Sequence, residues 1–146
     1  MTLRRVKPEE AKRLMDEESY VYLDVRSVQE FEQGHPTGAF NVPLMHMSPA
    51  GMQPNAQFLD VVTRAFEKDA KIVVGCKAGT RSLRAGQTME QAGFTAVVDQ
   101  LAGFSGAADA FGRIAEPGWQ AKGLAVSTSA QAGRSWAELE QPKAKE

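Results

Sequence analysis

The sequence predicts an α/β fold in which a mainly parallel sheet carries helices on both faces. Two observations support this prediction. Residues 71–75 (KIVVG) form a short apolar run typical of a buried parallel strand. Residues 58–66 and 82–92 instead place apolar side chains on one helical face. At 146 residues, the chain has about the length of one domain.

The first part of the chain alternates between strand and helix signals. Pro8 suits the first position of a helix, and Ser27 and Glu30 have the Ser-x-x-Glu spacing of a capping box. The expected elements are a short start at residues 3–6, a helix from Pro8, a strand at 20–25, a capped helix from Ser27 and an extended segment at 39–42.

The second part of the chain continues this alternation. We expect a loop at 44–56, a helix capped by Asn55 and running to Phe66, a strand at 71–75, a loop at 76–81, a helix from about Ser82 to Ala92, a strand at 95–98 and a last short helix from Gly103 through Phe111. From residue 127 onward Ser, Ala, Gln and Lys dominate, which predicts a flexible tail over 127–146. Trp136 and Leu139 leave room for a short docked helix in this tail.

The composition excludes several classes of function. A net charge of -1 gives no general reason to expect binding to nucleic acid or to a membrane surface. No apolar run is long enough to span a bilayer, and the charged N-terminus lacks the apolar core of a signal peptide. We therefore expect a cytoplasmic protein. With one cysteine and two well separated histidines, no metal and no cofactor are expected.

The only cysteine, Cys76, is the candidate functional residue. It directly follows the strand at 71–75, at the sheet edge where α/β proteins bind ligands. Gly79 allows the following loop to curl around the sulfur so that backbone N–H groups point at it. Lys77, Arg81 and Arg84 add positive charge, and the next helix adds its N-terminal dipole. These features favour the thiolate. The alternative is an inert buried cysteine, which would fit a mid-strand position better.

The loop CKAGTR, residues 76–81, resembles the Cys-x-x-Gly-x-Arg loop of the rhodanese family. Further segments match in the right order: LDVR at 23–26, EFEQGHPTGAFNVP at 30–43, IVVGCKAGTRS at 72–82, and AGF at 92–94 and again at 102–104. The resemblance covers about residues 4–126. The chain is similar to the single-domain thiosulfate sulfurtransferases. The extent of the resemblance makes 1–126 the expected rhodanese domain.

The resemblance implies a rhodanese-like fold with a five-stranded sheet and a persulfide intermediate. Cys76 matches the sulfur carrier. The loop residues match the segment whose amides hold the persulfide: Lys77, Ala78, Gly79, Thr80 and Arg81. Asp24 and Arg26 match positions that support the site from behind. The implied partners are a small sulfur donor such as thiosulfate and an acceptor that is cyanide, a small thiol or a protein thiol.

Individual residues of the loop allow more than one role. Lys77 either attracts the dianionic donor or is an ordinary surface lysine, and Arg81 is expected to brace the loop by pairing with Asp24 or Glu30. The family often has a Gly-Gly pair followed by a nearby tryptophan. This chain has Ala102 and Gly103, with Trp119 after an insertion that could form part of the pocket rim.

Two alternatives to a sulfurtransferase remain. A phosphatase or arsenate reductase on the same scaffold would have five residues between cysteine and arginine, whereas this loop has four, Lys77 to Thr80. A shorter loop makes a smaller pocket, which suits one sulfur atom better than a tetrahedral oxyanion. The second alternative is a non-enzymatic rhodanese-like module that relays sulfur or binds a partner. Such modules commonly lack the cysteine that this chain retains.

Overall fold

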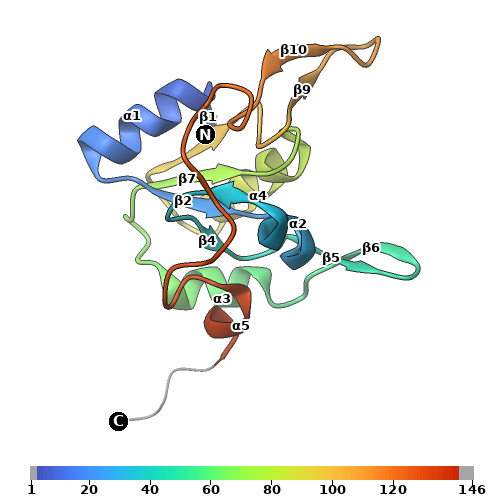
Figure 1. Ribbon diagram of the computed structural model, residues 1–146. Helices are drawn as coiled ribbons and strands as arrows, with labels where there is room; N and C mark the ends of the chain where they lie inside the picture. The colour runs from blue at the N-terminus through green and yellow to red at the C-terminus, as the bar shows by residue number, and fades with distance from the viewer. Residues whose placement is uncertain (1–2, 142–146) are drawn as a thin grey trace.

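A computed structural model describes residues 3–141, and its centre is a five-stranded sheet in which all neighbouring strands are parallel (Figure 1). In spatial order the strands are β1 (Arg4–Val6), β8 (Val97–Gln100), β7 (Ile72–Gly75), β2 (Val21–Asp24) and β4 (Phe40–Asn41). The predicted fold class is confirmed.

Alternation along the strands divides the core between the two faces of the sheet. Ile72 and Val74 of β7 face one side, and Val73 faces the other. The first side packs against α3 (Phe58–Ala65), α4 (Thr80–Gln91) and α5 (Trp136–Leu139), and the second against α1 (Pro8–Glu18) and Phe31 of α2 (Val28–Gln33). Among the helices of residues 3–141, none has the length and apolar character that a bilayer crossing requires.

Two hairpins extend from this body, and neither was predicted. The expected loop at 44–56 contains β5 (Met45–Ser48) and β6 (Gly51–Pro54), joined by a turn in which Gly51 has a φ of 103°. The predicted helix from Gly103 through Phe111 is wrong. Its place is taken by β9 (Gly106–Ala108), which pairs with β10 (Ile114–Pro117). Gly106 has a φ of 115°, which no helix interior accommodates.

Three predicted boundaries differ from the structure by two or three residues. α4 begins at Thr80, and β8 covers Val97–Gln100 instead of residues 95–98. α3 begins at Phe58, after the predicted cap. Asn55 instead accepts a hydrogen bond from the amide of Gln57 through Oδ1 at 2.9 Å, which forms a turn just before the helix.

The segment predicted as a tail packs along the domain as far as residue 141. β11 (Val126–Ser127) pairs antiparallel with β3 (His35–Pro36), and the chain then runs to α5. Trp136 of α5 is only 8% exposed and joins the core on the α3 side of the sheet. A large aromatic side chain can hold a polar segment in this way because its burial offsets the entropy of ordering. The last part of the predicted tail, 142–146, lies outside the described residues.

Replacing Trp136 with alanine tests this docking. Removing a buried tryptophan costs about 3–5 kcal/mol. We therefore expect the free energy of unfolding in urea to fall by about 3 kcal/mol. Phe111→Ala is the matched control, because Phe111 is 88% exposed at the outer end of the β9–β10 hairpin, and its removal should change stability by less than about 0.5 kcal/mol. Equal effects of the two changes would contradict a docked α5.

Candidate active site

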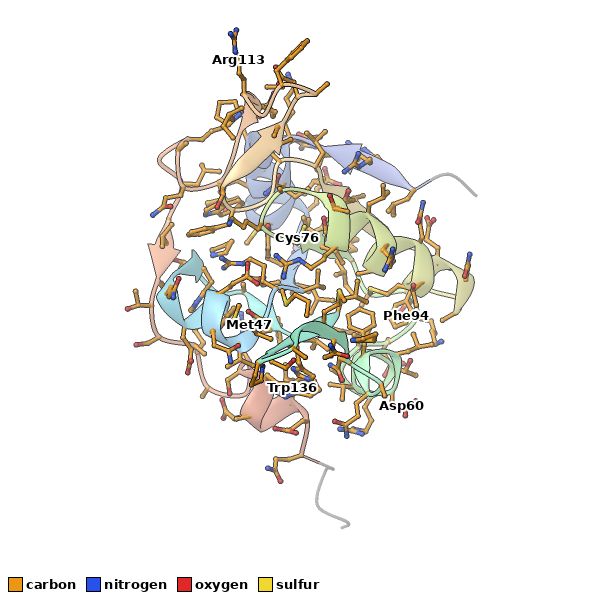
Figure 2. All side chains as sticks on the ribbon, turned by 90° about the vertical axis from the view of Figure 1, so that its right-hand side faces the viewer. Met47, Asp60, Cys76, Phe94, Arg113 and Trp136 are labelled. Carbon is orange, nitrogen blue, oxygen red and sulfur yellow. The ribbon has the colours of Figure 1, made fainter. Side chains whose placement is uncertain are left out.

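The candidate site lies at the carboxyl edge of the sheet, around the strand that carries Cys76. β7 is the middle strand, with β8 on one side and β2 on the other. The residues that follow these three strands therefore meet at one edge. Cys76 follows β7, Arg26 comes shortly after β2, and Phe104 comes shortly after β8. In Figure 2, Cys76 lies in the interior, between α4 and the β5–β6 hairpin that carries Met47.

The sulfur of Cys76 is buried and contacts two polar groups. The side chain is only 2% exposed. The amide of Gly79 donates a hydrogen bond to Sγ at 3.1 Å, and the Cys76 thiol donates to Oγ of Ser82 at 3.4 Å. The sulfur also lies beside the first turn of α4, where the helix dipole is positive. The Gly79 amide and the helix dipole both stabilise a negative charge on sulfur.

Gly79 gives the loop its shape. Its φ is 98°, a region that favours glycine. A Cβ at this position would lie 2.2 Å from the carbonyl oxygen of Leu101, so there is no space for any side chain. Backbone conformation and packing both require glycine here, and together they direct the Gly79 amide at the sulfur.

The start of the loop is fixed by the segment after β8. The amide of Phe104 donates to the carbonyl of Cys76 at 2.7 Å, and the amide of Ser105 donates to the carbonyl of Lys77 at 2.9 Å. Gly103 makes this approach possible, because a Cβ there would lie 2.4 Å from the Lys77 carbonyl oxygen. The loop is therefore held by backbone contacts from a neighbouring strand end.

Arg81 closes the loop by pairing with Glu30, one of the two acids expected from the sequence. The two terminal nitrogens of its guanidinium group, Nη1 and Nη2, donate to the Glu30 carboxylate oxygens at 2.7 and 3.0 Å. Glu30 also completes the predicted capping box with Ser27. Burial alone raises the pKa of Glu30, but hydrogen bonds from Arg81 and Ser27 outweigh it and lower the pKa to about 2.

The pair Asp24 and Arg26 lies beneath the loop, and both residues are buried. Their charged groups are 2.7 Å apart. Arg26 also donates to the carbonyl of Gly34 at 2.6 Å, and its guanidinium group lies 4.4 Å from the ring centre of Phe104. A buried ion pair with this many partners holds α2, β2 and the segment after β8 in one arrangement.

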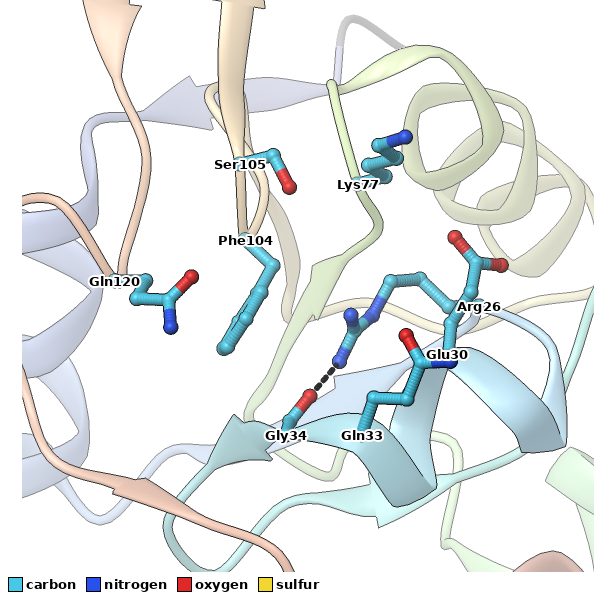
Figure 3. Close-up of a pocket in the computed structure, with 8 residues that line it drawn as sticks. All are labelled: Arg26, Glu30, Gln33, Gly34, Lys77, Phe104, Ser105 and Gln120. Carbon is cyan, nitrogen blue, oxygen red and sulfur yellow. Dashed lines mark hydrogen bonds between the residues drawn. The ribbon is translucent and has the colours of Figure 1, made fainter.

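A cavity of about 260 Å³ opens beside the loop (Figure 3). Its lining is mostly polar and comes from four separate segments: Arg26, Glu30, Gln33, Gly34, Lys77, Phe104, Ser105 and Gln120. Lys77 is exposed and makes no ion pair with residues 3–141, whereas Arg26 and Glu30 are both paired. The unpaired charge in the lining is therefore positive, which suits an anion.

The insertion before Trp119 contributes to this cavity only through its end. Trp119 itself is buried and packs edge-on against Tyr22, with ring centres 5.3 Å apart, while its neighbour Gln120 reaches the cavity wall. Of the other loop residues, Ala78 is exposed and Thr80 is the first residue of α4.

Three polar residues near the sulfur were not singled out from the sequence. They are Ser82, which contacts the sulfur, and the pair formed by Asp99 of β8 and Arg5 of β1. One signal was available, since Asp99 is a charged residue that directly follows the apolar run at 96–98, at the carboxyl end of a strand.

This fold and this loop define an α/β domain that carries a buried cysteine after its central strand, with a backbone amide directed at the sulfur. The rhodanese-like domain family model matches residues 7–110. The chain belongs to the rhodanese-like domain family.

Relatives and a solved structure agree with this assignment. The chain is 46% identical over 84 residues to Thiosulfate sulfurtransferase 16, chloroplastic, and 41% identical over 97 residues to Rhodanese-like domain-containing protein 15, chloroplastic, both of Arabidopsis thaliana. The matches cover 58% and 66% of this chain, and 70% and 53% of the relatives. The crystal structure of Rv0390 from M. tuberculosis superposes with a TM-score of 0.72 at 26% identity, covering 88% of this chain and all of that one.

The predicted cytoplasmic location is contradicted by these relatives. Both of the relatives described above are named chloroplastic, and a third, at 36% identity, is named Protein HIGH ARSENIC CONTENT 1, mitochondrial. The prediction rested on composition and on the charged N-terminus. These features describe how a chain interacts with water and do not identify a compartment.

Glu30→Gln tests the bracing of the loop through pH. Because the pKa of Glu30 is lowered on folding, its contribution is present above about pH 4.5 and is lost as the pH falls toward 2. We expect the variant to be less stable at pH 7, by at most about 3 kcal/mol, and to match the unchanged protein near pH 2.

The measurement is urea unfolding at several pH values, with Glu32→Gln as the control. Glu32 is exposed on the same helix and makes no ion pair among residues 3–141. A constant stability difference between Glu30→Gln and the unchanged protein from pH 7 to pH 2 would show that the ion pair does not brace the loop.

Proposed function

We propose that the protein is a sulfurtransferase that carries sulfur as a persulfide on Cys76, with thiosulfate or a similar anion as donor. The observation that carries this proposal is the contact of 3.1 Å between the Gly79 amide and the Cys76 sulfur, in a loop with four residues between Cys76 and Arg81. The contact supports an anionic sulfur at the end of a parallel strand. Membership of the rhodanese-like family and the name of one relative, Thiosulfate sulfurtransferase 16, support the same chemistry.

The proposed reaction has two displacements at sulfur. The Cys76 thiolate attacks the outer sulfur of thiosulfate. The sulfur–sulfur bond of the donor breaks, and its electron pair leaves with sulfite. The product is a Cys76 persulfide anion, so the total charge of -3 is conserved. Cyanide or a thiolate then attacks the outer persulfide sulfur. The bonding pair returns to Cys76 as the thiolate, and thiocyanate or a new persulfide departs.

The surrounding residues have distinct roles in this proposal. The Gly79 amide and the dipole of α4 stabilise the negative charge on sulfur in both steps. Lys77 attracts the dianionic donor into the cavity, because its charge is unpaired among the described residues. Ala78 and Thr80 complete the loop. Arg81 keeps the loop closed through Glu30, and Asp24 and Arg26 hold the floor beneath it.

A second candidate is arsenate reduction or phosphate ester hydrolysis on the same scaffold. One relative is named HIGH ARSENIC CONTENT 1, which favours testing arsenate. The loop argues against both reactions, because four residues between Cys76 and Arg81 leave less room for a tetrahedral oxyanion than five would. Thiol-dependent formation of arsenite from arsenate, or turnover of an aryl phosphate, at rates above that of sulfur transfer would favour this candidate.

The proposal predicts thiosulfate-dependent formation of thiocyanate from cyanide. Cys76→Ser should lower the rate by at least about 10³-fold, because an alcohol is not ionised at neutral pH and cannot carry the sulfur. The assay is colorimetric detection of thiocyanate. Thr88→Val serves as the control, because this half-buried residue of α4 bonds through its hydroxyl to the Arg84 carbonyl and not to the loop. Activity that survives in Cys76→Ser would exclude the mechanism.

A further inference from the structure

A buried polar cluster lies behind the loop, on the side away from the cavity. Its member closest to the sulfur is Ser82, a fully buried residue of α4. With a neutral thiol, the Cys76 sulfur donates to Oγ of Ser82 at 3.4 Å, and the Ser82 hydroxyl donates to the carbonyl oxygen of Gly79 at 3.5 Å. An anionic sulfur has no proton to give, so at this contact it can only accept from the hydroxyl. A hydroxyl has one proton, so it donates to one acceptor at a time. Which acceptor receives this proton decides whether an anionic sulfur gains a second hydrogen bond.

Asp99 is a further acceptor for that proton. It pairs in register with Val74 of β7, and alternation puts its side chain on the α4 side of the sheet. Asp99 is fully buried. Its Oδ2 accepts from Arg5 at 2.7 Å, but its Oδ1 is buried and completes no hydrogen bond with the described residues. Burial raises the pKa of Asp99, and the Ser82 hydroxyl and Arg5 oppose that rise. Geometry also connects the two residues, because Ser82 and the Asp99 partner Arg5 both donate to the carbonyl of Gly79.

Arg5 connects the other side of the cluster. Besides binding Asp99, it donates to the Gly79 carbonyl at 3.2 Å. The Gly79 carbonyl thus has a charged donor of its own and does not depend on Ser82. This leaves the sulfur and the unpaired oxygen of Asp99 as the two acceptors that compete for the hydroxyl proton. An unpaired buried carboxylate oxygen costs about 1–3 kcal/mol, so the competition is strong.

We propose that Ser82 is a further catalytic residue that donates a hydrogen bond to the anionic sulfur of Cys76, and that Asp99 is a positioning residue that competes for the same proton. This inference rests on the proposed function, in which the sulfur is anionic. When Asp99 is ionised, it draws the hydroxyl away from sulfur. When its charge is removed, the hydroxyl turns to sulfur and stabilises the thiolate or persulfide anion.

Other charged and titratable groups surround the cluster. They are Arg5 on β1, Tyr22 and Asp24 on β2, and Arg81 on α4. A simple change of charge at Asp99 would act on sulfur through space in the same direction as the proposed competition. The experiment must therefore separate an effect that passes through the Ser82 hydroxyl from one that does not.

The experiment is a double-mutant cycle on the reactivity of the sulfur. The chain has one cysteine, so the rate of alkylation by iodoacetamide reports on Cys76 alone. The rate is measured at a pH below the midpoint of its pH dependence. There we expect Ser82→Ala to lower the alkylation rate about tenfold, which corresponds to the loss of one hydrogen bond to a charged group. Asp99→Asn should raise this rate about threefold to tenfold, since a neutral amide competes weakly for the proton. In the Ser82→Ala background, Asp99→Asn should change the rate less than twofold.

Controls keep structural damage apart from the proposed role. Ser82→Thr retains a hydroxyl and should restore the rate to within about threefold. Thr88→Val removes a hydroxyl from the same helix that bonds only to the Arg84 carbonyl, and it should have no effect. If Ser82→Ala does not fold, Ser82→Gly takes its place in the cycle, because it also lacks the hydroxyl. The same loss of about tenfold is then expected, and Asp99→Asn should again change the rate less than about twofold in that background.

The proposal is overturned by either of two results. An equal effect of Asp99→Asn with and without the Ser82 hydroxyl would mean that Asp99 acts through its charge alone. An unchanged pH profile in Ser82→Ala would mean that the hydroxyl gives no bond to sulfur. Alkylation requires no sulfur donor, so failure of the protein to accept sulfur from thiosulfate would count against the proposed function and leave this test unaffected.

Discussion

The structure of the site depends on one constraint, the left-handed backbone of Gly79 packed against the carbonyl of Leu101. This conformation directs an amide at the Cys76 sulfur and at the same time starts α4 one residue later. Any side chain at position 79 would collide with the β8 end and also strain the backbone. A loop of this kind needs support from its neighbours, and Glu30 and Arg5 supply part of it.

The support comes from separate parts of the chain. Glu30 reaches the loop from α2, Arg5 reaches it from β1, and the amides of Phe104 and Ser105 hold its first two carbonyls. Many of these contacts use backbone atoms, whose geometry varies less than that of long side chains. A rigid loop suits an anion-stabilising site, since amides that are already oriented need not reorganise when charge develops on sulfur.

The sequence predicted the parts of the fold that follow from local patterns. The apolar run at 71–75, the Ser27–Glu30 capping box and the glycine of the CKAGTR loop each encode their structure within a few residues. The β9–β10 hairpin was missed because its apolar spacing resembles a helix, and only the left-handed Gly106 rules that out. The docking of α5 depends on where Trp136 finds a partner across the fold, which no local pattern contains.

The same distinction applies to the site. Cys76, Gly79 and Arg81 could be found because the loop is continuous in the sequence. The pairing of Asp99 with Arg5 joins residues 94 positions apart, and it follows only from the strand order that places β1 beside β8. Long-range pairs between edge and inner strands are therefore the part of the site that sequence patterns miss.

The central claim is that the sulfur of Cys76 is held as an anion that accepts and gives up one sulfur atom. Intact mass spectrometry after incubation with thiosulfate tests it most directly. We predict a gain of one sulfur atom, about 32 Da, that disappears on addition of cyanide and does not form in Cys76→Ser. An unchanged mass in a sample shown to be folded would contradict the account, and so would a mass gain that persists in Cys76→Ser.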